Sequence, residues 1–254
     1  MTVDGRLSTE KIMLTIFTKE LRSFLSSLIA YIVIVVFLTG IGLFMWVFPS
    51  TNVLDYGYAD LESLFSLAPY VFMFLIPAIT MRTFAEEKKT GTMELLFTRP
   101  LTDWDIILGK YLSSLVLVIL ALVPTLVYYF SIYQLGIQQG NIDTPGTMGS
   151  YFGLILLGAV FTSIGLLASV LTESQIVSFI VALFLCFIFF EGFGYLANIR
   201  DSSDFSYYIV QLGISYHYET IRRGLIDSRN LMYFVSVITV MLLTTKLILG
   251  SRKW

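Results

Sequence analysis

Charge is scarce in this chain of 254 residues. Aspartate, glutamate, lysine and arginine make up 13% of it, whereas 56% of the residues are hydrophobic. A soluble domain carries about 25% charged residues, so this chain has roughly half the usual charge. With a mean hydropathy of +0.81, the composition predicts an integral membrane protein. The net charge of −2 gives no basis for a nucleic-acid partner.

Cysteine and histidine are almost absent. Cys186 stands alone, which excludes a disulfide within the chain, and His217 stands alone, which argues against a histidine-based metal site. The phosphate-binding motif G-x-x-x-x-G-K-[S/T] is missing, because Gly109-Lys110 is followed by Tyr111. We therefore expect this chain to be no enzyme and to bind no cofactor or metal of its own.

Long intervals without charge predict six membrane-spanning helices. About 20 apolar residues are needed to cross a bilayer, and Lys246 fits the last interval because a lysine near a helix end reaches the interface. The first apolar run is also too long for a cleavable signal peptide. The expected fold is an all-α polytopic membrane protein, a single domain over residues 1–254. Its predicted spans are about 24–48, 63–81, 106–133, 149–171, 174–196 and 231–250.

Lysine and arginine predict the orientation of these spans. Of the 16 basic residues, four precede the first span, five lie between residues 82 and 110, and three lie at the carboxyl end. Because basic residues collect on the cytoplasmic side, we expect a multi-pass protein of the inner membrane with both termini in the cytoplasm. The other four lie within residues 197–230, which six spans place outside the cell. This interval disagrees with the rule.

The amino-terminal segment predicts a helix of its own. Within residues 8–22, Ile12, Ile16 and Leu21 fall on one side, and lysines stand among the polar residues. This pattern is typical of an interfacial helix that lies along the inner leaflet, and we expect it within residues 1–22. A continuous helical extension of the first span is the alternative. Met13 is an alternative start of the chain.

The second and third spans are joined by the one long polar interval on the cytoplasmic side. A polar helix end, Phe84–Lys89, meets Thr90–Thr92, where Gly91 allows the chain to turn. Arg99-Pro100 stops the next helical turns, and Thr102–Asp105 predicts a capping box at the start of the third span. We expect a helix at 85–99 across the cytoplasmic ends of the two spans. An ordinary cytosolic loop is the alternative.

Small residues form a stripe along the fourth span. Gly158, Thr162, Gly165 and Ser169 follow one another at i, i+4, i+7 and i+11. Small residues let helices approach closely in lipid. Because a tight turn at 172–174 makes the fourth and fifth spans neighbours, we expect packing within the chain and not a dimer seam.

The segment before the last span is too aromatic for a solvated loop. Residues 197–230 predict short re-entrant or interfacial helices on the outside. Glu191 and His217, near this end, are candidates for substrate contact. A glutamate that reaches the interface and a structural histidine are the alternatives.

Three stretches resemble a known family. The string FAEEKKTGTMELLFTRPLTDWDIILGKYLSS at 84–114 is closely similar to the ABC-2 family of transporter permeases. In that family an acidic pair is followed by Gly-Thr-x-Glu-Leu-Leu, Pro-Leu-Thr and Gly-Lys. Residues 17–46 and 215–234 also fit, the second through a pattern of an aromatic residue, four others and Arg-Gly-Leu-Ile-Asp. The sequence of these stretches is most similar to the gliding-motility-associated permeases of the family, the GldF type.

The resemblance implies roles for particular residues. Residues 82–105 become a coupling loop that contacts a separate ABC ATPase subunit, which would hold the ATP and Mg. Lys19 and Glu20 belong to the interfacial helix. Residues 197–230 become an extracytoplasmic cap with Tyr218, Arg223, Gly224 and Asp227. The residues expected at the ATPase contact are Glu86, Glu87, Gly91, Thr92, Glu94, Leu95 and Leu96.

The resulting expectation is the permease subunit of an ABC transporter, an exporter linked to gliding motility. Its partners would be the ATPase, a second permease chain (identical or homologous), a gliding-motility membrane subunit and membrane lipid. A scaffold that anchors partners without transport is one alternative. An ion-coupled transporter or channel is another, although such carriers keep ionisable groups at mid-membrane and the first four spans hold none at their centres.

Overall fold

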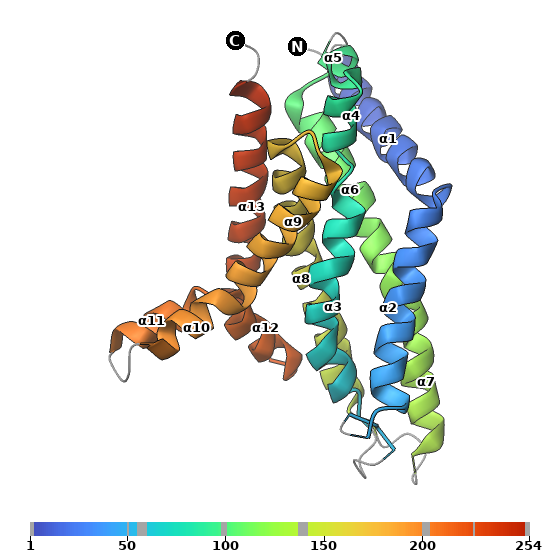
Figure 1. Cartoon of the computed structure of the whole chain (residues 1–254), viewed down its shortest axis with the longest axis vertical. Coiled ribbons are helices and arrows are strands. Elements are labelled where there is room, and N and C mark those ends of the chain that lie inside the picture. The colour runs from blue at the N-terminus through green and yellow to red at the C-terminus, as the bar shows by residue number, and fades with distance from the viewer. Residues whose placement is uncertain are drawn as a thin grey trace.

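The computed structural model describes residues 3–49, 51–54, 60–97, 101–136, 142–199, 204–225 and 227–251. Every regular element in these ranges is a helix (Figure 1). Five helices are long and apolar enough to cross a membrane, or six when the bent pair of α1 and α2 counts as one span. The predicted all-α polytopic fold is confirmed. In chain order the elements are α1 (Val3–Leu25), α2 (Leu28–Trp46), α3 (Glu62–Thr80), α4 (Ala85–Lys89), α5 (Thr92–Phe97), α6 (Asp103–Leu122), the 3₁₀ turn η1 (Val123–Thr125), α7 (Leu126–Leu135), α8 (Thr144–Leu171), α9 (Gln175–Phe187), the π-helical turn η2 (Ile188–Gly192), α10 (Phe193–Ile199), α11 (Asp204–Gln211), α12 (Ile214–Arg222) and α13 (Ser228–Gly250).

The amino-terminal helix is separate from the first span. α1 ends at Leu25 and α2 begins at Leu28, and the two helices are turned by 67° relative to each other. The two helices therefore do not form one straight helix. α2 has 19 residues and a length of about 28 Å, close to the thickness of about 30 Å of a hydrocarbon core. α1 instead packs along α6, and its place at the inner leaflet stays a prediction.

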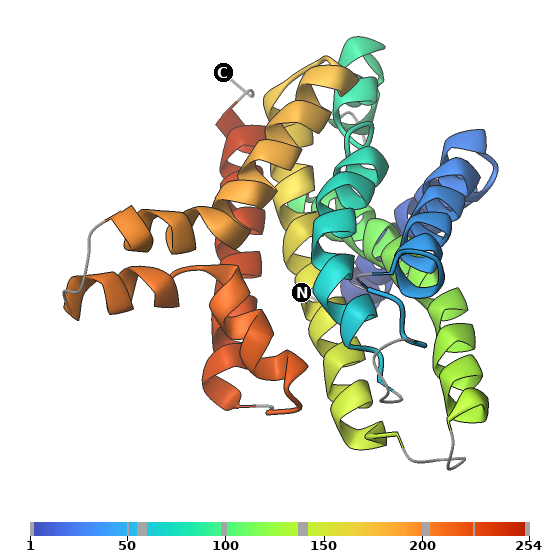
Figure 2. The ribbon, with the colours of Figure 1, turned by 60° about the horizontal axis from the view of Figure 1, so that its bottom comes forward.

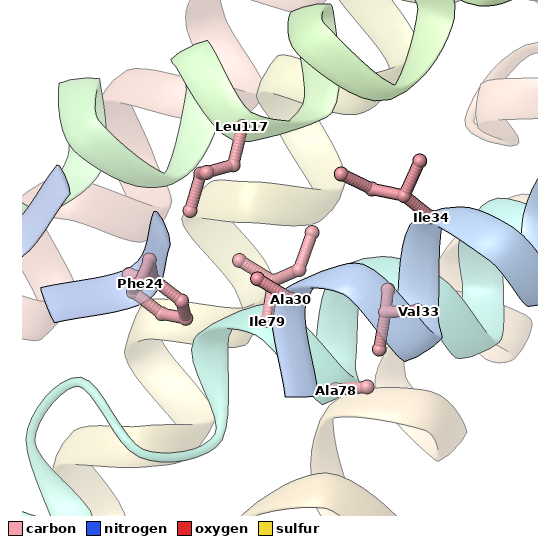
Figure 3. A pocket seen from close by; sticks show the side chains of 7 residues that line it. All are labelled: Phe24, Ala30, Val33, Ile34, Ala78, Ile79 and Leu117. Atoms are coloured by element: carbon pink, nitrogen blue, oxygen red, sulfur yellow. The ribbon is translucent and has the colours of Figure 1, made fainter. Parts of the chain in front are cut away.

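A small apolar pocket lies beside the elbow, the bend between α1 and α2 at Ser26 and Ser27. Four helices contribute its side chains, which converge in Figure 3. Arg82 closes the elbow, since its guanidinium lies 4.1 Å from the centre of the Phe24 ring and donates a hydrogen bond of 3.1 Å to Ser27 Oγ. On α3 the pocket begins directly after Pro77, which lies inside the helix. The lining residues are Phe24, Ala30, Val33, Ile34, Ala78, Ile79 and Leu117.

The predicted helix at 85–99 is two short helices. α4 follows α3 after a turn, and α5 begins at Thr92. Gly91 between them has φ +70, a left-handed conformation that glycine adopts without steric cost. The single helix was therefore wrong, and the predicted turn at Gly91 is confirmed. Residues 98–100, with the predicted stop, lie outside the described residues.

The third span is longer than predicted and is interrupted once. The capping box is confirmed: Thr102 Oγ1 accepts a hydrogen bond from Asp105 N, and Asp105 Oδ2 accepts one from Thr102 N at 3.0 Å. α6, η1 and α7 together cover residues 103–135. The 3₁₀ turn contains Pro124, which has no N–H to continue the helical ladder.

α8 is the central helix. It is 83% buried over its most apolar stretch, whereas α9 and α13 are 22% buried. Figure 2 shows α8 between α3 on one side and α9 and α13 on the other. The small-residue stripe packs on α6 and α3: a Cβ atom at Gly158 would lie 2.9 Å from Val118 Cγ1 on α6, and one at Gly165 would lie 2.1 Å from Thr80 Oγ1 on α3. The stripe therefore packs within the chain, as predicted.

The chain between the fifth and last spans forms three short helices. α9 continues through η2 into α10, and α11 and α12 return to the bundle, where α12 packs on α8 and α13. In Figure 1, α10 and α11 project sideways, and both termini lie at the same end as α4 and α5. The predicted short helices are present. Their place relative to the bilayer stays a prediction.

Replacing Gly165 by alanine tests the close approach of α8 and α3. The added methyl overlaps Thr80, so we expect Gly165→Ala to lower the free energy of unfolding by about 1–3 kcal/mol. Gly40 in α2 is the matched control, because a Cβ there meets nothing within 4 Å and alanine gains up to about 1 kcal/mol of helix propensity. Thermal unfolding of the purified protein in detergent measures both. Equal unfolding temperatures for the two variants would contradict this packing.

Candidate functional site

A buried lysine joins three helices at the end of the molecule that carries α4. Lys110 Nζ on α6 lies 3.0 Å from Glu20 Oε1 on α1 and 2.9 Å from Glu87 Oε1 on α4. It also donates to the carbonyl of Thr83 at 2.7 Å, and the Phe84 ring lies over it at 5.1 Å. Only 1% of the lysine side chain is exposed. The ammonium therefore depends on these partners in place of water.

Lys19 completes this group at the surface. Its Nζ lies 3.3 Å from Glu20 Oε1 and 3.3 Å from Glu87 Oε1, and its side chain is 60% exposed. The two lysines balance the two glutamates, and we call these four residues the Lys110 network. Removing one partner of a buried ion pair costs about 3–5 kcal/mol, whereas an exposed pair contributes about 0–1 kcal/mol. Lys110 is therefore the member on which the network depends.

Gly109 explains how the network comes together. A Cβ at this position would lie 2.9 Å from Ile16 Cγ2 and 3.3 Å from the carbonyl of Met13. Only a residue without a side chain lets α1 approach α6 so closely. Gly109 thus allows the close approach of α1, and the next residue, Lys110, supplies the buried charge.

α8 holds α4 from the other side. Ser169 Oγ accepts hydrogen bonds from the backbone N–H groups of Phe84 at 3.0 Å and Ala85 at 3.1 Å, and it donates to the carbonyl of Met81 at 3.1 Å. Lys88 Nζ donates to the carbonyl of Val170. The first turn of α4 is therefore fixed both to the end of α8 and to the Lys110 network.

The residues predicted to contact an ATPase differ in their exposure. Glu86, Gly91, Thr92 and Glu94 are exposed. Met93 is buried in one cluster with Phe84 and Ile107 and anchors α5, so that the polar residues of this segment remain outside. Glu87, in contrast, turns inward to Lys110. Leu95 and Leu96 lie on α5, but their side chains fall outside the described residues.

The residues predicted for the external cap serve mostly as supports, and they lie apart from the Lys110 network. Tyr218 is buried and donates to the carbonyl of Phe65 at 2.7 Å. Gly224 has φ +80 and lies against Gly146 and Gly149. Asp227 Oδ1 accepts from Arg229 N at the start of α13. Arg223 is exposed. The motif therefore ends α12, crosses the start of α8 and begins α13.

Arg222 adds an ionic contact at this end. It pairs with Glu219 at 2.6 Å and with Glu62 at the start of α3. Burial lowers the pKa of Arg222, but the carboxylates of Glu219 and Glu62 outweigh it and hold that pKa above its usual value. The pair ties α12 to α3.

His217 has a structural role, which the sequence offered as the alternative to substrate contact. Its Nδ1 lies 2.7 Å from Asn230 Oδ1 and its Nε2 lies 2.9 Å from the carbonyl of Gln211. The ring also stacks on Tyr233 at 3.8 Å. Both ring nitrogens are thus engaged inside the protein. Among the described residues, no group of three or more His, Cys, Asp or Glu side chains is placed to hold a metal ion.

Sequence reasoning missed Lys110 as a site residue. It placed Lys19, Glu20 and Glu87 in two separate segments, and the structure brings them together on this lysine. A signal was present in the sequence: a lysine inside an apolar run requires a partner, and the nearest carboxylates lie in the polar segments before the first and third spans.

Comparison with known proteins identifies a family and two relatives. The family described as "ABC-2 family transporter protein" matches residues 14–243. The chain is also similar to "Probable multidrug ABC transporter permease YbhR" of Escherichia coli, strain K12 and strain O157:H7. Each is 27% identical over 128 residues, which is 50% of this chain and 32% of the relative. The matched part thus spans about a third of the length of these relatives.

Because the family match covers nearly the whole chain, this multi-pass membrane protein belongs to the ABC-2 family of transporter proteins.

Proposed function

We propose that this chain is the permease subunit of an ATP-driven exporter and that a separate ATPase subunit acts on α4 and α5. The observation that carries the proposal is the Lys110 network, which ties the polar α4 to two membrane helices. A force applied to the exposed residues of α4 and α5 would therefore reach α1 and α6 directly. The chain has no phosphate-binding motif, so ATP and Mg belong to the partner.

The orientation follows from the same site. Both termini lie at the end that carries α4 and α5 (Figure 1), which supports our proposal that this end is cytoplasmic in the inner membrane. A second permease chain, identical or homologous, would complete the pathway. The name of the relatives, a probable multidrug ABC transporter permease, supports transport of drugs, whereas gliding motility, with its further membrane subunit, rests on the resemblance of the sequence alone. We propose export as the activity and assign no part in motility.

Replacing Gly91 tests the contact of α4 and α5 with the ATPase. Valine at φ +70 is strained by about 1–2 kcal/mol, so we expect Gly91→Val to displace α5 and reduce the bound ATPase several-fold. Gly91→Asn is the matched control, because asparagine tolerates this conformation and a Cβ at this position meets nothing within 4 Å. Glu94→Ala removes an exposed carboxylate without strain and should also weaken binding. The measurement is co-purification of the tagged chain in mild detergent, with the partner identified by photolabelling with an ATP analogue and by vanadate-sensitive ATP hydrolysis. Full retention of that ATPase by both Gly91→Val and Glu94→Ala would refute the contact.

Replacing Lys110 tests the connection between α4, α1 and α6. Lys110→Met leaves Glu20 and Glu87 without their buried cation, and we expect a loss of about 3–5 kcal/mol in the free energy of unfolding. Lys19→Met removes the exposed cation of the same network and should cost less than about 1 kcal/mol. Thermal and urea unfolding in detergent compare the two. If both variants unfold alike, the network does not hold these helices together.

A further inference from the structure

A half-buried carboxylate lies on the fifth span, away from the Lys110 network. Glu191 belongs to η2, the π-helical turn of the fifth span, and its Oε1 accepts a hydrogen bond of 2.8 Å from the hydroxyl of Tyr70 on α3. Single π-helical turns within α-helices occur frequently at functional sites. The extra residue in such a turn re-aims the side chains that follow it.

The depth of this pair follows from its position on α3. Tyr70 lies eight residues after Glu62 and ten before Thr80, which are the two ends of α3. At 1.5 Å per residue, the pair is about 12 Å from one end of α3 and about 15 Å from the other. The pair therefore lies near the middle of α3, whereas Glu191 is six residues before the end of its own candidate span, Gln175–Ala197. That this glutamate reaches the interface stays an alternative.

Glu191 also lacks a cationic partner. Among the described residues no lysine or arginine lies within 4 Å of its carboxylate, and Tyr70 is its one hydrogen-bond donor. Charged groups inside a membrane are costly, and they are almost always paired or placed along a substrate path. Lys110, which is buried in the bundle, has two carboxylates. Glu191, in contrast, has no opposite charge beside it, and a bound cation would supply one.

Aromatic rings surround the carboxylate on the outer faces of α3 and the fifth span. Phe190, next to Glu191, is buried and meets the edge of the Tyr70 ring at 6.0 Å. Phe187 and Tyr195, four residues before and after Glu191, stack at 6.3 Å. These two rings and Tyr70 are between 42% and 59% exposed, and Phe74 and Phe184 extend the exposed aromatic surface along the two helices.

We propose that the Tyr70–Glu191 pair and the exposed rings beside it bind organic cations with an apolar body. The carboxylate supplies the opposite charge, and aromatic faces attract cations such as quaternary ammonium groups, more strongly where water is excluded. An inorganic cation would gain little from the rings, and a neutral amphiphile would gain nothing from Glu191. That these cations are the exported substrates rests on the proposed function above.

Direct binding tests this site without any ATPase. The full chain in lipid nanodiscs is titrated with radiolabelled methyltriphenylphosphonium and, separately, with its neutral counterpart triphenylphosphine oxide. We expect saturable binding of the cation that Glu191→Gln weakens at least tenfold, while binding of the neutral compound is unchanged. Glu173→Gln is the matched control, because Glu173 is exposed in the turn before the same span, and it should leave both unchanged. Tyr70→Leu should weaken cation binding several-fold, and Tyr70→Phe less than twofold.

The possible outcomes separate this inference from the proposed function. Absence of saturable cation binding to the unaltered chain, or equal binding by Glu191→Gln, overturns the site and leaves the contact with the ATPase standing. If cation binding depends on Glu191 but the chain recruits no ATPase, the site is supported and the proposal of an ATP-driven exporter is refuted. Thermal unfolding of each variant shows that a loss of binding is not a loss of the fold.

Discussion

The buried charge of Lys110 is the constraint on which the end of the molecule with α4 depends. An ammonium that has lost its water is stable only beside opposite charge, and the two carboxylates that supply it come from α1 and α4. Three helices that are distant in the sequence must therefore meet at one point. Gly109 makes the meeting possible, because α1 packs directly against its backbone. Gly109 and Lys110, which are adjacent in the sequence, thus provide the close packing and the buried charge of this region.

The other constraints of the fold separate a rigid part from its hinges. Ser169 and Lys88 fix α4 to the end of α8, and the small residues of α8 fix that helix to α3 and α6. The helices are interrupted at the elbow between α1 and α2 and at η1 after α6, whereas α3 runs through Pro77 without a break. The apolar pocket adjoins the elbow. A push on α4 would therefore move α1, α4 and the adjoining parts of α6 and α8 as one body, and the elbow would take up this movement.

Local features were predictable from the sequence, and long-range pairings were not. Charge-free runs predicted the spans, Gly91 predicted the turn between α4 and α5, and Thr102 with Asp105 predicted the start of α6, because each signal lies within a few residues. The contact of Lys110 with Glu20 joins residues 90 positions apart, and no periodicity reports such a pairing. The inward turn of Glu87 depends on the same contact. The π-helical turn that carries Glu191 packs on α12, and helical periodicity in the sequence gave no sign of it.

The central claim is that α1 and α4 move together, and spin-label distances test it most directly. The labels replace the exposed residues Thr18, Glu86 and Val36, in pairs, in a chain with Cys186 changed to alanine and together with the ATPase subunit that we propose as its partner. On addition of ATP the account predicts an unchanged distance between positions 18 and 86, which the Lys110 network holds, and a shifted distance between positions 18 and 36, across the elbow. A shift between 18 and 86 with an unchanged distance between 18 and 36 would contradict it.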